Sequence, residues 1–252
     1  MFQVKTNTKY AEKDKQMKLY GKNPVLERIK TAPQTIKKLY LQERTDLSEI
    51  VRAAKNARLD FVPVTRARLE SELKDARAQG VMAEIEEYVY SSFFGILDEA
   101  VKEKRVPVFL DGITDPQNFG SIIRTLACMG GFSVVLPAHG SAAVNETVLR
   151  VASGGENYVK IARVENIATA INKAKSRGFY IVGAEIDGES MRSDLKVTPP
   201  AALVIGAEGK GIRPGVKKCL DKAVSLPMGG AALSYNASVA AALFCYEIKK
   251  RM

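Results

Sequence analysis

The stretch VPVFLDGITDPQNFGSIIRTLACMGGFSVVLP, residues 106–137, decides the fold class of this chain. Its two apolar runs, residues 106–110 and 132–136, have the composition of strands that are buried on both faces. Residues 119–129 lie between them, with apolar side chains at helical spacing. A strand, a helix and a second strand in close succession are typical of a parallel sheet with helices packed on its faces.

The same alternation continues to the C-terminal end of the chain. Further strands are expected at residues 158–164, 179–183, 202–206 and 223–228, and further helices at residues 146–152, 167–177, 215–220 and 237–249. The pattern therefore predicts one α/β domain over residues 106–252. In such sheets ligands bind beside the loops that follow the carboxyl ends of the strands, so we expect the chemistry there.

A second, smaller α/β segment precedes this domain. Expected helices at residues 24–30, 47–59 and 68–74 alternate with expected strands at residues 36–41, 61–64 and 81–90. We divide the chain into a basic tail that we expect to be mobile, a small domain, a charged linker and the large domain. These four parts cover residues 1–16, 17–96, 97–105 and 106–252.

The charge of the chain favours an acidic partner. The net charge is +10 at neutral pH, and the first sixty residues contain 14 lysines and arginines against 7 acidic residues. Nucleic acid is a natural partner for such a surface, although a protein that is merely basic has the same composition. No apolar run is long enough to span a bilayer, and the lysine-rich N-terminus lacks the apolar core of a secretory signal. We expect the protein in the cytoplasm.

The thiols and the imidazole do not suggest a metal site. Cys128, Cys219 and Cys245 lie far apart in sequence, and His139 is the only histidine. Buried free thiols on helices are the simplest expectation for the three cysteines. We expect no metal.

Three loops that follow expected strands contain residues suited to chemistry. In the first, Asn118 stands near a helix start and Arg124 lies six residues further on. A fixed guanidinium at the end of a sheet suits a phosphate or a developing oxyanion. Taken alone, the pair is more simply a helix cap and a surface arginine.

The second loop has the sequence GAEGKG at residues 206–211. Its three glycines permit a close backbone approach to a ligand. The spacing matches neither the phosphate-binding loop of nucleotide hydrolases nor the dinucleotide-binding fingerprint. Glu208 either pairs with Arg124 across the end of the sheet or is an ordinary turn acid.

The third loop, within residues 226–243, is rich in small residues that let backbone groups face a flat ligand such as adenine. Ser234 and Asn236 precede an alanine-rich helix, where such side chains cap the helix or help to bind an anion. No histidine stands beside Ser234, which disfavours a serine hydrolase.

Together and in this order, the three loops resemble the motifs of the SpoU (TrmH-like) family of knotted RNA 2′-O-ribose methyltransferases. The resemblance rests on DPQNFGSIIR at residues 115–124, GAEG at 206–209, LPM at 226–228 and SYNASVA at 234–240. It covers essentially all of residues 106–252. The family more often has leucine, valine and histidine where this chain has Tyr235, Ala237 and Ala78.

The first domain resembles the ribosomal-protein-like substrate domain of the family's ribosomal RNA branch. Its opening is LYGKNPVLE at residues 19–27 and its end is QGV at residues 79–81. The resemblance implies methylation of a guanosine ribose in 23S ribosomal RNA, with the basic domain holding RNA mostly through phosphates. Two alternatives stay open: the same reaction on tRNA, and a non-catalytic RNA-binding or ribosome-assembly protein.

The resemblance also implies a deep trefoil knot in the large domain, S-adenosylmethionine as cofactor and a homodimer that packs through the knot. The implied cofactor-binding residues are Gly206, Leu226 and Tyr235, followed by Met228 and Gly183. The implied catalytic and substrate-side polar residues are Asn118, Arg124, Glu208, Ser234 and Asn236. Among these we expect Arg124 to stabilise the developing alkoxide and the adjacent phosphate, oriented by Glu208 and Asn118.

Overall fold

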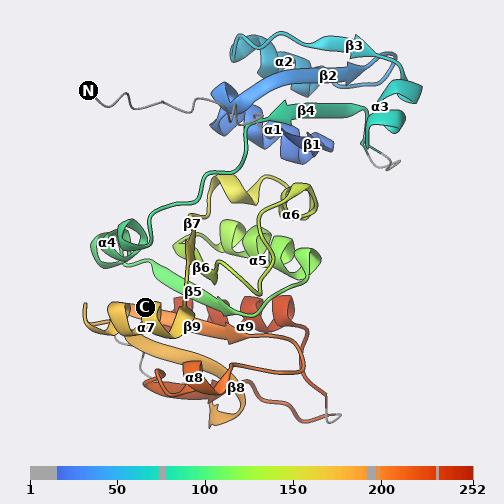
Figure 1. Cartoon of the computed structure of the whole chain (residues 1–252). Coiled ribbons are helices and arrows are strands. Elements are labelled where there is room, and N and C mark those ends of the chain that lie inside the picture. Colours follow the sequence, from blue (N-terminus) through green and yellow to red (C-terminus); the bar gives the residue numbers. More distant parts are fainter. Residues whose placement is uncertain (1–15, 74–77, 192–196, 198, 231–232, 252) are drawn as a thin grey trace, which may run out of the picture.

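The computed structural model describes residues 16–73, 78–191, 197, 199–230 and 233–251. They form two α/β domains, drawn one above the other in Figure 1. The tail expected over residues 1–16 lies outside the described residues, except for Gln16. Within the described part of the chain, no helix is long and apolar enough to cross a membrane.

The N-terminal domain is a mixed four-stranded sheet. Its strand order is β1 (Met17–Tyr20), β4 (Val81–Ile85), β2 (Ile36–Gln42) and β3 (Val62–Val64), with β4 antiparallel to both of its neighbours and β2 parallel to β3. A short turn of 3-10 helix, η1 (Pro33–Thr35), leads into β2.

Helices cover both faces of this sheet because alternate residues of a strand point to opposite sides. Leu39 and Leu41 of β2 belong to the core that also contains residues of α1 (Lys22–Thr31) and α2 (Ser48–Asn56). Tyr40, between them, packs in a separate core with α3 (Arg66–Leu73).

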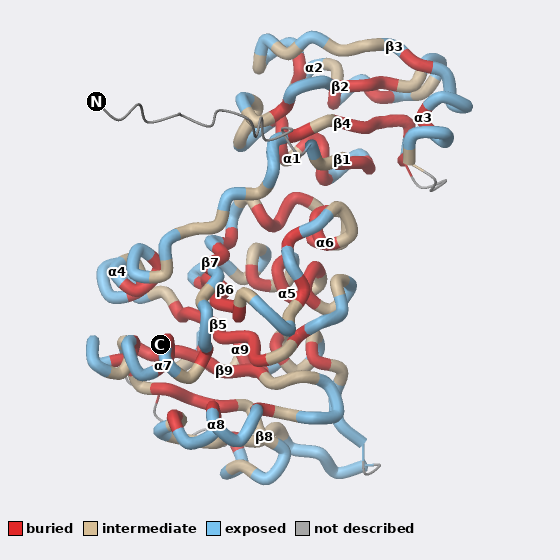
Figure 2. The backbone as a smooth tube through the Cα atoms, viewed as in Figure 1, coloured by how far each residue is buried: buried red, intermediate tan, exposed pale blue. Residues whose placement is uncertain are grey.

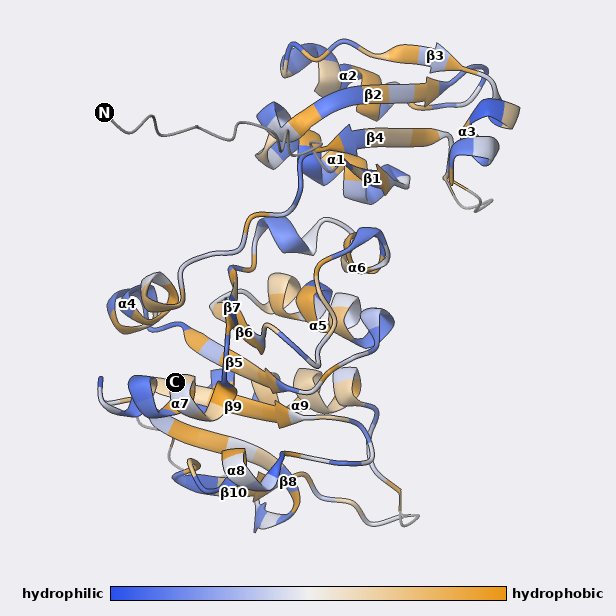
Figure 3. Ribbon diagram, viewed as in Figure 1, coloured by the Kyte–Doolittle hydropathy of each residue, from blue (hydrophilic) through white to orange (hydrophobic). Residues whose placement is uncertain are grey.

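The C-terminal domain is built on a six-stranded sheet in which every pair of strands is parallel. The order is β10 (Lys222–Ser225), β8 (Tyr180–Ser190), β9 (Ala201–Gly206), β5 (Val106–Asp111), β6 (Phe132–Pro137) and β7 (Ile161–Val164). Both β5 and β6 are buried along their whole length (Figure 2), and their apolar residues stand out in Figure 3. The predicted α/β fold with a parallel sheet is confirmed.

Two separate cores lie on the two faces of this sheet. Val108 and Leu110 of β5 pack with α5 (Pro116–Met129), α6 (Glu146–Ala152) and α9 (Ala237–Arg251). Phe109 packs on the other face with α4 (Phe93–Glu103), α7 (Ile167–Lys175) and α8 (Pro214–Lys217). A second 3-10 helix, η2 (Gly155–Asn157), follows α6.

Residues 97–105, which we expected as a linker, instead form most of α4 and its end. The helix begins after Ser92, whose hydroxyl accepts a hydrogen bond from the Gly95 amide. Ile96, Leu97 and Ala100 are buried in the core shared with α7. The charged residues lie on the solvated side of the helix, so the charge run marked an exposed face rather than a linker. Strand β1 was also not expected, because its four residues give too short a pattern.

Candidate active site

Asn118, Glu208 and Asn236 form a hydrogen-bonded cluster beyond the carboxyl ends of β5 and β9. Asn236 Nδ2 donates to Asn118 Oδ1 at 2.9 Å and to Glu208 Oε2 at 3.5 Å. Asn118 Nδ2 donates to the same Glu208 oxygen at 3.3 Å. Among the described residues, Glu208 Oε1 has no hydrogen-bond partner, so this oxygen is available to a substrate hydroxyl.

The helix starts on either side hold the two asparagines in place. Asp115 caps α5 by accepting hydrogen bonds from the Gln117 and Asn118 amides, and this cap places Asn118 in the first turn. Asn236 Oδ1 accepts hydrogen bonds from the Ser238 amide at 2.9 Å and from the Ser238 hydroxyl at 2.6 Å, at the start of α9. Its oxygen is thus committed to the helix, and its NH₂ group is directed to the cluster.

The loop that carries Glu208 is a tight, anchored turn. A Cβ on Gly206 would lie 2.1 Å from the Gly211 carbonyl carbon, so only glycine fits there. Ala207 and Gly211 exchange backbone hydrogen bonds across the turn. Asp111, fully buried at the end of β5, accepts hydrogen bonds from Arg213 Nε at 2.7 Å and from the Arg213 amide at 2.8 Å. Glu208 therefore projects from a rigid support.

A largely apolar pocket opens beside the cluster. Its buried residues include Ile205, Ala237 and Phe244, whereas Glu208 and Tyr235 are exposed at its opening. The described residues that line it include two carboxylates, Glu185 and Glu208, and no lysine, arginine or histidine.

This lining fits S-adenosylmethionine. Apolar and small side chains suit the adenine ring, and the exposed polar groups at the opening suit the sugar and amino acid parts. The sulfonium carries a positive charge, which the Glu208 carboxylate attracts and no cationic side chain in the described lining repels. The residues therefore match the cofactor expected from the sequence.

Glu185 is a pocket residue that sequence reasoning missed. Its side chain is 7% exposed, and it accepts a hydrogen bond from the Ile212 amide at 3.2 Å and forms an ion pair with Lys217 at 2.5 Å. The hydrogen bond to Glu185 raises the pKa of Lys217. An acidic residue just beyond the apolar run that predicted β8 was the signal that could have revealed it.

Most of the residues expected at the site line this pocket, namely Gly206, Glu208, Leu226, Met228, Ser234 and Tyr235. Gly183 does not. A Cβ at that position would lie 2.3 Å from Leu220 Cδ1, so this glycine makes room for a core side chain. Its neighbour Ala184 lines the pocket instead.

Arg124 does not join the cluster. Six residues after Asn118, it lies about 9 Å further along α5 and about 240° around the helix axis. The sequence left open whether Glu208 pairs with Arg124 or is an ordinary turn acid; among the described residues Glu208 accepts hydrogen bonds from Asn118 and Asn236, and no contact joins it to Arg124. Arg124 lines a different groove, which lies between the two domains.

The cysteines correct one further expectation. Cys219 and Cys245 are buried as free thiols, but Cys128 is exposed on α5. Burial raises the pKa of the Cys245 thiol, which keeps it protonated within the core.

Family models match both domains of the chain. The model of the SpoU rRNA Methylase family matches residues 105–246. A model described as RNA 2′-O ribose methyltransferase substrate binding matches residues 18–91. The two matches correspond to the domain with the polar cluster and to the N-terminal domain, respectively.

Individual relatives extend over nearly the whole chain. A Staphylococcus haemolyticus (strain JCSC1435) protein, named for the TrmH family of tRNA/rRNA methyltransferases, is 35% identical over 239 residues, which cover 92% of this chain and 95% of the relative. The structure of the SpoU methyltransferase AviRb from Streptomyces viridochromogenes, in complex with the cofactor AdoMet, is 25% identical with a TM-score of 0.76 and covers 94% of this chain and 90% of AviRb. The A. aeolicus TrmH/SpoU tRNA modifying enzyme is 30% identical with a TM-score of 0.52, and it covers 62% of this chain and 84% of its own.

Proposed function

The chain belongs to the SpoU rRNA methylase family, and we propose that within this family it methylates the ribose 2′-hydroxyl of a guanosine in 23S ribosomal RNA. Membership makes the chain an enzyme that methylates RNA at a ribose 2′-oxygen with S-adenosylmethionine as methyl donor. A trefoil knot in the C-terminal domain is typical of this family. The observation that carries the catalytic part of the proposal is the Asn118–Glu208–Asn236 cluster at the edge of an acidic, otherwise apolar pocket.

The N-terminal domain supports a ribosomal rather than a transfer RNA substrate. The A. aeolicus tRNA modifying enzyme covers 62% of this chain, so more than a third of the chain has no counterpart in it. The substrate-binding model, in contrast, matches residues 18–91. A separate domain for the substrate suits a large RNA whose recognised features lie far from the reacting ribose.

Glu208 is the residue that we assign to the ribose 2′-hydroxyl. S-adenosylmethionine, when bound, supplies a methyl group that is already activated on its sulfonium. The protein then has to align the acceptor oxygen and orient its lone pair, a contribution of up to roughly 7–11 kcal/mol in ideal systems. Glu208 Oε1 accepts the hydrogen bond of the hydroxyl, while Asn118 and Asn236 hold the carboxylate through Oε2.

The other polar residues are assigned by their positions. Ser234, at the opening of the pocket, hydrogen-bonds the substrate or the cofactor. Arg124 lies outside the cluster, so we assign it to an RNA phosphate near the target rather than to the 2′-oxygen. Backbone groups around Gly206, Leu226 and Tyr235 hold the cofactor, with Met228 beside them.

We further propose that the enzyme acts as a homodimer that packs through α9. Val239, Leu243 and Tyr246 are exposed although they are apolar or aromatic, and their spacing of four and three residues places them on one side of the helix. Such a stripe is typical of an interface. Light scattering should show a dimer, and Leu243→Glu should shift it toward monomer.

The proposed substrate is tested by transfer of tritiated methyl groups. Tritiated S-adenosylmethionine is incubated with the enzyme and with rRNA or tRNA from a strain lacking the gene, and the label is mapped after nuclease digestion. We expect label in one 2′-O-methylguanosine of 23S rRNA. Label only in tRNA would support the proposed reaction but contradict the proposed rRNA substrate. No label in either, despite cofactor binding, would contradict the proposal for naked RNA and favour a binding role or a ribosomal precursor particle.

A further inference from the structure

Glu185 is a buried carboxylate in the wall of the cofactor pocket, and the proposed reaction gives it no role. Its side chain is 7% exposed. The other polar side chains in the described lining belong to Glu208, Ser234 and Tyr235, which are exposed at the opening. Among the described polar residues of the pocket, Glu185 is therefore the one that a bound ligand meets inside rather than at the rim.

A bulge in β8 brings Glu185 to the pocket. This strand pairs with β10 through Gly183 and again through Glu189, and the β10 partners of these two residues are adjacent in sequence. Residues 184–188 are thus additional on β8. The pairing of β8 with β9 ends at Ala184. Bulges re-aim side chains and are frequent beside active sites, and this one places Glu185 just beyond the paired part of the strand.

Two contacts hold the Glu185 carboxylate in place. Its Oε1 accepts a hydrogen bond from the Ile212 amide at 3.2 Å, and its Oε2 forms an ion pair with Lys217 Nζ at 2.5 Å. An ionised carboxylate has about four acceptor sites, so each oxygen keeps acceptor capacity beyond these contacts. Lys217 is 43% exposed and lies outside the described lining of the pocket. The carboxylate is therefore fixed from one side and available to a ligand from the pocket.

The charge of the ion pair decides which part of S-adenosylmethionine suits Glu185. The hydrogen bond to Glu185 raises the pKa of Lys217, so this lysine stays charged at neutral pH and neutralises the carboxylate. A neutralised carboxylate attracts a sulfonium or an ammonium group only weakly, but it still accepts hydrogen bonds. The cofactor ribose offers two adjacent hydroxyl donors without charge. In dinucleotide-binding folds, an acidic side chain likewise hydrogen-bonds a ribose hydroxyl of the ligand.

We propose that Glu185 binds the ribose of S-adenosylmethionine by accepting hydrogen bonds from its 2′- and 3′-hydroxyls. The two carboxylates of the pocket then have different roles, because Glu185 holds the cofactor ribose and Glu208 faces the reacting groups. The inference rests on the methyl donor of the proposed function, but not on the RNA or the guanosine assigned there.

The first test compares ligands with and without these hydroxyls. Isothermal titration without RNA gives the Kd of S-adenosylhomocysteine, which lacks the transferred methyl group, and of its 2′-deoxy and 3′-deoxy forms. On the wild-type protein each deoxy form should bind about 10–100-fold more weakly, because a hydrogen bond to a charged acceptor is lost. A deoxy form that binds as tightly as S-adenosylhomocysteine would contradict the contact with the missing hydroxyl.

Glu185→Gln tests whether this residue causes the discrimination. Glutamine keeps an oxygen for the Ile212 amide but removes the charge of the acceptor, and hydrogen bonds between neutral groups are roughly half as strong. The ratio of the Kd of a deoxy form to that of S-adenosylhomocysteine should fall to about 3–10-fold. Each ratio compares two ligands on one protein, so a general change in the shape of the pocket cancels. A ratio equal to that of the wild type would overturn the proposal.

Lys217→Gln is the matched control. It breaks the same ion pair but leaves the carboxylate in the wall of the pocket. If the ion pair only supports the fold of the pocket, Lys217→Gln and Glu185→Gln should change the ratio equally, and this result would contradict the proposal. We expect Lys217→Gln to keep the wild-type ratio.

These measurements separate the role of Glu185 from the proposed RNA substrate. A protein with the expected Kd ratios that methylates only tRNA would support the ribose contact and contradict the 23S substrate. An enzyme that methylates 23S rRNA, but whose wild-type Kd ratios are near one, would contradict only the role of Glu185.

Discussion

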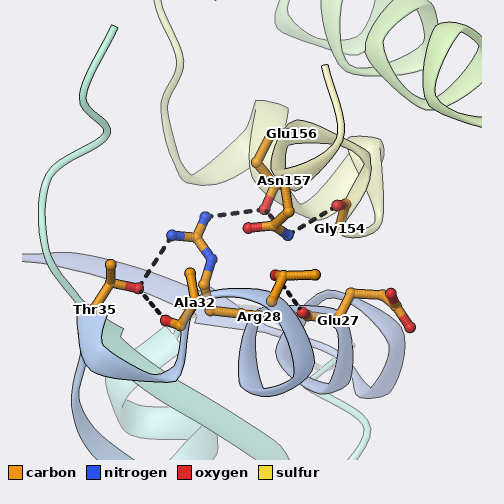
Figure 4. Close-up of polar contacts among 8 residues, drawn as sticks. Glu27, Arg28, Ala32, Thr35, Gly154, Glu156 and Asn157 are labelled. Atoms are coloured by element: carbon orange, nitrogen blue, oxygen red, sulfur yellow. Dashed lines mark hydrogen bonds and ion pairs between the residues drawn. The ribbon is translucent and has the colours of Figure 1, made fainter. Parts of the chain in front are cut away.

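The polar cluster and the domain junction are built in opposite ways. The cluster joins three segments of one domain, and at the end of its sheet Asn118 is half-buried and Glu208 is exposed. The junction, where α1 meets η2, joins two domains through an ion pair between Arg28 and Glu156, which are 128 residues apart and buried (Figure 4). In the proposed function, the geometry of the reaction thus depends on the C-terminal domain, whereas the placement of RNA depends on how the domains dock. Changes at one region should leave the other intact.

The largest expected effect is on stability, at the junction. Glu156→Leu leaves the Arg28 guanidinium buried without its partner, so the free energy of unfolding should fall by about 3–5 kcal/mol. Urea denaturation followed by circular dichroism measures this change. S-adenosylmethionine affinity of the folded variant should equal that of the wild type, because the pocket lies within one domain.

A double variant provides the control for this prediction. Arg28→Met combined with Glu156→Leu replaces both charges with apolar groups and should recover most of the lost stability. A double variant that is as unstable as Glu156→Leu would show that packing, not the buried charge, explains the loss.

The next largest effect is on catalysis, at the cluster. Glu208→Gln keeps an oxygen for Asn118 and Asn236 but replaces the free acceptor with an NH₂ group, so kcat should fall about 10²–10³-fold. Isothermal titration should show a smaller change in the Kd for S-adenosylmethionine than in kcat, because the variant removes only one attraction to the sulfonium. Glu189→Gln, which alters a carboxylate paired with Lys222 near the end of β8, should retain wild-type kcat. A Glu208→Gln variant with wild-type kcat would show that this carboxylate takes no part in the reaction.

Alanine substitutions at two glycines, one at the junction and one away from it, test how tightly the domains are packed. Gly154 and Gly178 have positive φ angles of +92° and +85°, but only Gly154 would place a Cβ against another helix, whereas Gly178 would meet nothing within 4 Å. Alanine at either position should cost roughly 1 kcal/mol in backbone strain. Gly154→Ala should lose about 1–3 kcal/mol more through the clash with Glu27, and its KM for rRNA should rise.

Thermal melts and methyl-transfer kinetics on the two glycine variants check this expectation. Equal losses at the two positions would mean that the domains separate easily enough to relieve the clash. The junction would then not hold the two domains rigidly together.

The smallest expected effect concerns pH. The hydrogen bond from the Tyr158 hydroxyl lowers the pKa of Glu27 below its ordinary value of 4.5. It therefore stabilises the folded protein fully at pH values above 4.5, and this stabilisation is lost as the pH falls through the lowered pKa. Tyr158→Phe should therefore be less stable than the wild type by under about 1 kcal/mol at neutral pH. The difference should vanish in acid, as measured by urea denaturation across the pH range. A stability difference between the two proteins that does not change with pH would show that ionisation of Glu27 is not its cause.

Sequence patterns predicted the cluster better than the junction. Asn118, Glu208 and Asn236 could be brought together because the strands are parallel and each loop follows a carboxyl end. The Arg28–Glu156 pair could not be foreseen, because a contact between residues 128 apart leaves no local pattern. Arg124 lies on another side of the helix that carries Asn118, because a separation of six residues turns the helix by about 240° beyond one full rotation.

The most direct test of the proposed function compares RNA from cells with and without the gene. Mass spectrometry of nuclease-digested 23S rRNA and tRNA should show one 2′-O-methylguanosine that disappears from 23S rRNA when the gene is deleted. The wild-type gene should restore it, and the gene for Glu208→Gln should not. A 2′-O-methylnucleoside lost from tRNA, with 23S rRNA unchanged, would contradict the proposed substrate.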